Sequence, residues 1–184
     1  MEERSGTDGF EAYVGVGSNV DPEENILAAL PRIRSAVEVV AASRFYRNPA
    51  ISPDRRKLPP FVNGVLEIRT THCPRDLKYV VLRGIERRVD RRRTGDRFGP
   101  RTLDLDLLVY GNLEVDSEEL TLPAPDISAH AFWAVPLAEL LPELCPPRSS
   151  LPMKELVHNL DTRSMVYMES FTKRVRQTLH LPPE

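Results

Sequence analysis

Two aspartates two residues apart, Asp104 and Asp106, are the clearest sign of chemistry in the sequence. Leucines alternate with them through residues 102–110, a pattern that predicts a strand with both carboxylates on one face. Side-by-side like charges repel, and they are tolerated when a cation lies between them or when one is protonated. Magnesium suits such a pair, because it prefers oxygen ligands and is often held by one or two carboxylates plus substrate phosphates. For a lone Asp-x-Asp, an acidic edge strand facing water is the alternative.

A basic segment directly precedes this strand. It contains glycine and proline, which favour a loop, and five arginines: Arg91, Arg92, Arg93, Arg97 and Arg101. Arginine suits phosphate oxygens because its planar guanidinium donates two parallel, charge-assisted hydrogen bonds. An arginine-rich loop beside two carboxylates is the outline of a polyphosphate site. The arginines further upstream, at 83, 87 and 88, fit a solvated helix end equally well.

Other nucleotide and catalytic signatures are missing from the sequence. Gly15-Val16-Gly17 lacks the third glycine of a dinucleotide-binding turn, and the Walker sequence GxxxxGK[ST] does not occur. None of the histidines at 72, 130, 158 and 180 has a partner at metal-ligand spacing. Any ATP would therefore bind without a P-loop, and no Ser/His/Asp assembly can be argued.

The elements that must position these residues follow the order β-α-β-β-α-β. Strands are expected at 13–16, 39–46, 61–70 and 102–110, and helices after Asp21, whose side chain is expected to cap the first, and after Pro74. This order predicts an α+β, ferredoxin-like core with a mainly antiparallel sheet and helices on one face. Short helices and a last C-terminal helix would follow. Residues 48–60 form a proline-rich loop of a length that is often functional.

Composition places the chain among ordinary soluble globular proteins. Its 184 residues are 41% apolar and 28% charged, which predicts one domain over 1–184. Within it we expect a core at about 12–145, the range of the family resemblance described below, and a C-terminal helical extension at about 151–184. No apolar run approaches the roughly 20 residues of a membrane span. The polar start and the two cysteines, interpreted as reduced thiols that are buried or incidental, predict a cytoplasmic protein. The net charge of -2 argues against a general nucleic-acid-binding surface.

Four sequence runs closely resemble the 6-hydroxymethyl-7,8-dihydropterin pyrophosphokinases: YVGVGSN at 13–19, SRFYRNP at 43–49, FVN at 61–63, and above all RFGPRTLDLDLLVYGN at 97–112. The resemblance covers roughly residues 12–145 and implies a folate-synthesis enzyme. Its reaction would be attack by the pterin's hydroxymethyl oxygen on the β-phosphorus of ATP, with AMP leaving. The expected partners are ATP and a reduced pterin, with no nucleic acid and no membrane, and the expected state is a monomer or weak homodimer.

The resemblance also assigns roles to individual residues. Two magnesium ions would be held by Asp104 and Asp106, with Glu86 as a supporting acid. The catalytic set would be Arg91, Arg93, Arg101, Asp104 and Asp106. The pterin would be bound by Asn48, Ile51, Phe61, Asn63 and Phe132, with the two phenylalanines on the faces of the ring and Asn63 on its edge. The nucleotide would be contacted by Arg91, Arg101, Leu107, Thr121 and His130.

The chain departs from the family pattern on the nucleotide side. Ala124 stands where histidine is usual, while His130 and Glu119 stand where arginines are usual. These changes keep open a catalytically weak homologue that binds pterin or nucleotide without efficient turnover. A third reading is an RNA-binding module with the same order of elements. Against it stand the missing RNP1 aromatics, the aspartate pair and the negative net charge.

Overall fold

The computed structural model describes residues 9–50, 58–89, 101–147 and 149–183. Its main sheet has the order β5-β1-β4-β3-β8, with β2 also paired to β4, and each recorded pairing is antiparallel. The strands are β1 (Phe10–Ser18), β2 (Glu38–Ala42), β3 (Tyr46–Asn48), β4 (Phe61–Thr70), β5 (Asp104–Tyr110) and β8 (Val166–Tyr167). A separate ribbon pairs β6 (Val115–Asp116) with β7 (Thr121–Leu122). The predicted ferredoxin-like order and antiparallel sheet are confirmed.

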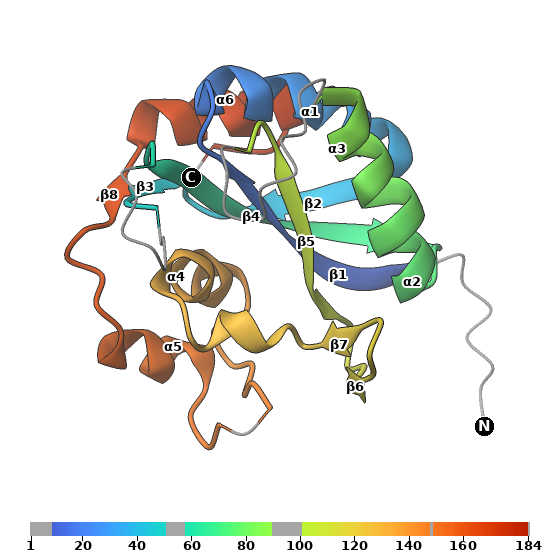
Figure 1. The fold of residues 1–184 in the computed structure, drawn as a ribbon, viewed down its shortest axis with the longest axis vertical. Coiled ribbons are helices and arrows are strands. Elements are labelled where there is room, and N and C mark those ends of the chain that lie inside the picture. Colours follow the sequence, from blue (N-terminus) through green and yellow to red (C-terminus); the bar gives the residue numbers. More distant parts are fainter. Residues whose placement is uncertain (1–8, 51–57, 90–100, 148, 184) are drawn as a thin grey trace.

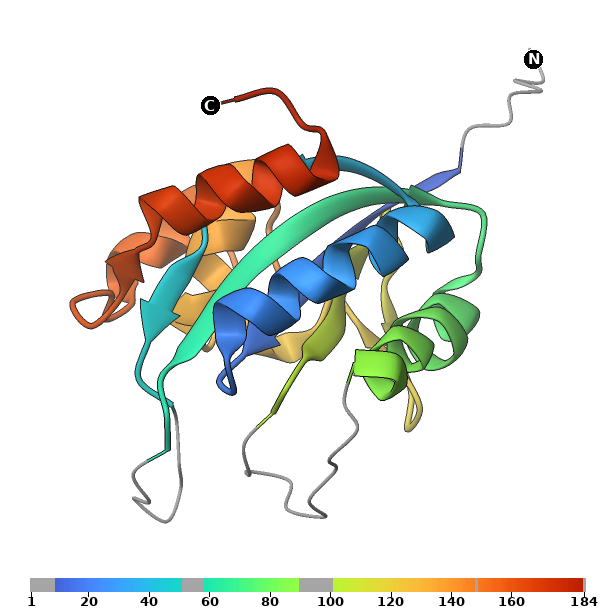
Figure 2. The same cartoon turned by 90° about the horizontal axis from the view of Figure 1, so that it is seen from above.

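Helices cover both faces of the sheet (Figure 1). One face carries α1 (Pro22–Ala36), α6 (Glu169–Leu179) and a continuous helical segment of α2 (Pro74–Asp76), the π-helix η1 (Leu77–Leu82) and α3 (Arg83–Val89). These three helical segments lie side by side when the molecule is seen from above (Figure 2). The opposite face carries α4 (Ala131–Leu140), with η2 (Pro125–Ile127), α5 (Met153–Leu156) and η3 (Val157–Asn159) around it. The two helices of the predicted β-α-β-β-α-β core, α1 and α2–η1–α3, thus share one face as expected, and the opposite face is covered by helices that follow this core in the chain.

The two apolar cores follow from the alternation of β1. Val14 and Val16 lie in the core beneath α1, whereas Tyr13 points to the core beneath α4 and packs with Trp133 and Leu137. In α1 the buried residues recur at helical spacing: Ile26, Ala29, Leu30 and Ile33. Burial on both faces explains why a strand with so few polar residues is stable in the middle of the sheet.

Three local expectations need correction. Asp21 makes no side-chain cap bond, because its backbone is left-handed with φ 40°. The strand expected at 39–46 is two strands, since Phe45 leaves the ladder and donates its backbone N–H to the Thr172 hydroxyl of α6, at 3.0 Å. Cys73 and Cys145 are both free and exposed, so of the two alternatives, buried or incidental, the buried one is wrong. Within the described residues, no helix combines the length and the apolar character needed to cross a membrane.

Two glycines of β1 leave room at the end of the sheet where the aspartates lie. Gly17 is paired with Asn63 on one side and with Asp104 on the other, and Gly15 is paired with Asp106. A Cβ at Gly17 would lie 2.6 Å from the Asn63 side-chain oxygen, and a Cβ at Gly15 would lie 2.7 Å from the Trp133 ring. At either position, any residue larger than glycine would force the neighbouring side chain to move.

We predict that Gly15→Ala destabilises the protein by about 1–3 kcal/mol, because the new methyl group overlaps the Trp133 ring. The matched control is Gly84→Ala in α3, where a Cβ meets no atom within 4 Å. This control should raise stability by about 0.5–1 kcal/mol, since alanine favours a helix over glycine. Urea unfolding measures both, and equal effects at the two positions would contradict the packing argument.

Candidate active site

The aspartate pair lies where β5 begins, at an edge of the main sheet. Asp104 and Asp106 are both half-buried and alternate with leucines whose side chains enter the core beneath the helices. Arg101 forms an ion pair with Asp104, and its side chain is 40% exposed against 22% for the carboxylate. The prediction that both carboxylates share one face is confirmed, because Asp104 and Asp106 are paired with Gly17 and Gly15 of the same strand.

Burial and neighbouring charge act strongly on Asp106. Its pKa is raised to about 7, first by burial and then by the negative charges of Asp104 and Glu86, against the opposing effects of Arg101 and Lys78. Glu86 is held close, because its carboxylate accepts the backbone N–H of Leu105 at 2.8 Å. At neutral pH this cluster is stabilised by a proton or by a cation.

The donors around the pair suit a hard cation. They are carboxylate oxygens, the ligands that magnesium prefers. In the part of the chain that the structure describes, no three His, Cys, Asp or Glu side chains cluster closely enough to hold a metal by themselves. A cation between Asp104 and Asp106 would therefore need oxygen ligands from elsewhere, such as substrate phosphates or water.

Stability without ligand should depend on pH through Asp106. Its pKa rises from 3.8 to about 7 on folding, so the folded state binds the proton more tightly and the unfolding free energy falls as pH rises through this range. Asp106→Asn removes this penalty and should raise the unfolding free energy at about pH 8.5 by on the order of 2 kcal/mol, with little gain at about pH 4.5. Urea unfolding at both pH values tests this. The exposed control Asp76→Asn should show no such rise, and a destabilised Asp106→Asn at the higher pH would contradict the prediction.

Several residues predicted to bind the pterin come together at the other side of Gly17. Asn63 and Asn48 are buried, and the Asn63 amide donates to the Asn48 side-chain oxygen at 2.7 Å. Asn48 is in turn paired with Phe61, the half-buried first residue of β4. The hydrogen bond between the Asn63 and Asn48 side chains sets the orientation of the Asn63 amide, whose oxygen lies toward Gly17. The buried amide is thus oriented before any ligand arrives.

Phe132 and His130 lie beside this cluster. A cavity of about 290 Å³ is lined by Asn48, His130 and Phe132 together with residues 160, 161, 164 and 165 of the C-terminal part. The two rings stack, with centroids 5.1 Å apart and an angle of 11° between their planes. His130, predicted to contact the nucleotide, therefore lies next to a residue predicted to bind the pterin.

A second cavity, of about 250 Å³, lies beside Asp106. Its lining includes Lys78, Leu107, Thr121, Ala124 and Trp133. The Thr121 hydroxyl donates to Asp116 at 3.1 Å. Leu107 is 2% exposed and its side chain lies in the opposite core, so its backbone is the part that can face this cavity. We name this space the Asp106 cavity.

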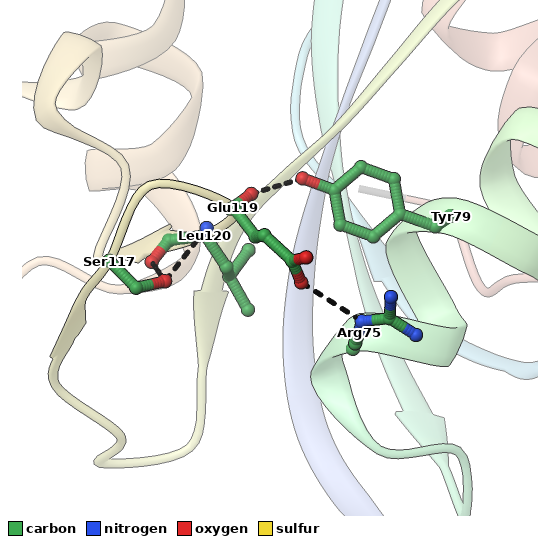
Figure 3. A network of polar contacts seen from close by, with 5 residues as sticks. All are labelled: Arg75, Tyr79, Ser117, Glu119 and Leu120. Atoms are coloured by element: carbon green, nitrogen blue, oxygen red, sulfur yellow. Dashed lines mark hydrogen bonds and ion pairs between the residues drawn. The ribbon is translucent and has the colours of Figure 1, made fainter.

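Glu119, which stands where the family pattern has arginine, also lines the Asp106 cavity and is held by the helix opposite (Figure 3). Its carboxylate pairs with Arg75 at 3.0 Å, and its backbone oxygen accepts the Tyr79 hydroxyl. Ser117 closes the turn by accepting the backbone N–H of Leu120 at 3.1 Å. The β6–β7 turn is thereby attached to α2 and η1.

The Arg75–Glu119 pair should restrain this turn more than it stabilises the fold. Both side chains are about two-thirds exposed and screened by water, so Arg75→Ala should change the unfolding free energy very little. Amide hydrogen exchange in residues 115–122 should nevertheless become faster. Lys154→Ala, which breaks the exposed Lys154–Glu143 pair, is the matched control and should leave exchange there unchanged. Unchanged exchange in Arg75→Ala would show that the pair does not hold the turn.

Three predicted site residues, Ile51, Arg91 and Arg93, lie outside the described residues. Sequence reasoning also missed two residues beside the aspartates. Lys78 lines the Asp106 cavity and Trp133 covers Gly15. No motif in the sequence pointed to Lys78 as a site residue. Trp133 could have been noticed as the single tryptophan of the chain.

The fold and the candidate site define a ferredoxin-like α+β protein with a carboxylate and arginine site beside a pocket of amide and aromatic side chains. The family model described as 7,8-dihydro-6-hydroxymethylpterin-pyrophosphokinase matches residues 13–142. The chain belongs to this family. This membership favours a pyrophosphokinase over an RNA-binding module.

Individual relatives agree with the family match. A 2-amino-4-hydroxy-6-hydroxymethyldihydropteridine pyrophosphokinase of Synechocystis is 35% identical over 153 residues, covering 82% of this chain and 76% of the relative. The enzyme of the same name from Haemophilus influenzae is 37% identical, covering 84% of this chain and 96% of the relative. That of Pseudomonas aeruginosa is 40% identical over 136 residues, covering 72% and 81%.

Solved structures support the fold. A Plasmodium falciparum HPPK-DHPS crystal structure superimposes with a TM-score of 0.63 at 11% identity, over 87% of this chain. The chain spans about half the length of that protein, with 47% covered. A second crystal structure of the same protein gives a TM-score of 0.64 at 11% identity, with 88% of this chain and 48% of that chain covered.

Proposed function

We propose that the chain transfers the pyrophosphoryl group of ATP to 6-hydroxymethyl-7,8-dihydropterin, giving the pterin diphosphate and AMP in folate biosynthesis. The observation that carries the proposal is the position of the Asp104 and Asp106 carboxylates, next to Arg101 and across Gly17 from the buried amide of Asn63. A place for polyphosphate and a place for a polar heterocycle thus adjoin. The identity of the two substrates is inferred from family membership.

On the pterin side, Asn63 would hydrogen-bond the edge of the ring, and Phe61 and Phe132 would contact its faces. Asn48 serves this arrangement by holding the Asn63 amide in one orientation, with Ile51 as a further contact. A buried, pre-oriented amide favours a substrate with matching donors and acceptors, because an unmatched ligand would leave the amide unsatisfied.

On the nucleotide side, Asp104 and Asp106 would hold two magnesium ions. When bound, these ions would offset the negative charge of the ATP phosphates. Arg91, Arg93 and Arg101 would donate hydrogen bonds to phosphate oxygens. Thr121, the backbone of Leu107, and His130 would complete the nucleotide contacts. We place this activity in the cytoplasm, in a monomer or weak homodimer without a nucleic-acid partner.

The reaction needs alignment more than covalent work by the protein. The hydroxymethyl oxygen forms a bond to the β-phosphorus of ATP and releases its proton to solvent, the bond from that phosphorus to the oxygen bridging the α-phosphate breaks, and AMP leaves with the bond's electrons. The side chains contribute by holding the two substrates in line and by stabilising charge on the phosphate oxygens.

We predict that Asp104→Ala and Asp106→Ala each lower pterin-dependent AMP release by about 100-fold or more, because either change removes a ligand that balances phosphate charge. The measurement is AMP formation from ATP and magnesium, with and without 6-hydroxymethyl-7,8-dihydropterin. Glu143→Ala, at an exposed acid that lines neither the Asp106 cavity nor the cavity beside Phe132, is the control and should stay near the wild-type rate.

The same assay separates the proposal from the weak-homologue alternative, which Ala124 and Glu119 motivate. If the wild-type chain binds the pterin by calorimetry but releases no AMP, the pocket persists without the transfer reaction and the proposed activity is wrong. Pterin-dependent AMP release at a normal enzymatic rate, lost in both variants, excludes that alternative.

A further inference from the structure

The residue that follows β1, Asn19, connects the two halves of the candidate site. It is buried, with 3% of its surface exposed. Its amide nitrogen donates to the backbone oxygen of Pro59 at 3.3 Å, and its amide oxygen accepts the backbone N–H of Arg101 at 2.7 Å. A second link is made by its own backbone, whose N–H donates to the Arg101 oxygen at 3.1 Å. One side chain thus reaches partners 40 and 82 residues away in sequence.

Each partner adjoins one half of the site. Pro59 comes two residues before Phe61, where β4 and the pterin side begin, and Arg101 comes three residues before Asp104. Because both bonds go to backbone atoms, they act on the path of the chain rather than on a single mobile side chain. The Asn19 amide therefore sets where the segment entering β4 lies relative to the segment entering β5.

The neighbouring Ser18 makes a different connection. It is fully buried, and its hydroxyl donates to the backbone oxygen of Thr102 at 2.8 Å. The further contacts of the hydroxyl are to the Val20 and Arg101 oxygens, so this side chain bonds the β5 side and not the β4 side, to which Ser18 is joined only through its backbone pairing with Val62. The bridging bond thus belongs to Asn19, and asparagine suits this position because one planar group supplies both a donor and an acceptor.

We propose that Asn19 is a positioning residue for pyrophosphoryl transfer, which holds the pterin-binding side and the phosphate-binding side at the separation that in-line attack requires. This inference rests on the proposed function. Each half of the site keeps its own internal contacts without Asn19: the Asn48–Asn63 bond on one side and the Arg101–Asp104 pair on the other. Removing Asn19 should therefore leave each substrate's binding largely intact while it disturbs their relative placement, to which transfer rates are very sensitive.

The test is Asn19→Ala in the full chain, with three measurements: kcat for AMP release at saturating substrates, the Kd of the pterin alone, and the Kd of a non-hydrolysable ATP analogue with magnesium. We expect kcat to fall by about ten-fold or more, with each Kd within about three-fold of wild type. Asn19→Ser keeps a small polar side chain in the turn but cannot reach both partners. It should show the same fall in kcat with little change in either Kd, and it replaces the alanine variant if that variant does not fold.

Asn25→Ala is the matched control. The Asn25 amide bonds the Val20 oxygen of the same turn at 2.6 Å, and so it supports the turn without joining β4 to β5. This variant should keep kcat within about three-fold of wild type even if its melting temperature falls as much as that of Asn19→Ala.

The outcomes are distinct. A wild-type chain that turns over, with Asn19→Ala indistinguishable from Asn25→Ala, overturns the positioning role and leaves the proposed function standing. A loss expressed wholly as weaker binding of the substrates overturns it as well, because the residue would then be part of a binding half. A wild-type chain that releases no AMP removes the proposed function, and the inference with it.

Discussion

Near one end of the sheet, Gly17 of β1 is paired with Asn63 of β4 on one side and with Asp104 of β5 on the other. Paired residues of adjacent antiparallel strands project to the same face, so this register alone brings an amide and a carboxylate from distant parts of the chain to the same place. The space between them exists because glycine has no side chain there. Helix α4 then covers the neighbouring Gly15 with Trp133, which closes one end of that face. The rest of the candidate site depends on this pairing.

The aspartates show that this face is not arranged for stability alone. Burial and two neighbouring acids raise the pKa of Asp106 to about 7, so ionising it in the folded protein costs free energy at neutral pH. Surface pairs such as Lys154–Glu143 carry no such penalty and contribute little, because water screens them. A destabilising charge cluster in an otherwise well-packed sheet is expected where a ligand supplies the missing positive charge. The opposing effects of Arg101 and Lys78 offset the repulsion only in part.

Periodic patterns within short stretches of sequence predicted the features that depend on neighbouring residues alone. The strand at Phe61–Thr70, the body of α1 and the shared face of Asp104 and Asp106 follow from periodicity, and all are present. The break between β2 and β3 could not be predicted, because it depends on a hydrogen bond from Phe45 to a residue of the last helix. The bond between Asn63 and Asn48 and the reach of Asn19 depend in the same way on strand register and on distant backbone atoms. The resemblance predicted the site residues, and the register explains how Asn63 and the two aspartates are oriented.

One departure from the family pattern, Glu119, gains a physical account when its partners are considered. At position 119 an arginine would have added positive charge to the Asp106 cavity, whereas Glu119 removes it and is itself paired with Arg75 (Figure 3). Lys78, one turn along the same helical segment, lines that cavity and acts to lower the pKa of Asp106. Because Arg75 neutralises Glu119 on the outside while Lys78 faces the cavity, helical segment α2–η1 supplies the cations that the β6–β7 turn lacks. The change at 119 is thus offset by charge from the opposite wall, which is a reason to expect phosphate binding to survive it.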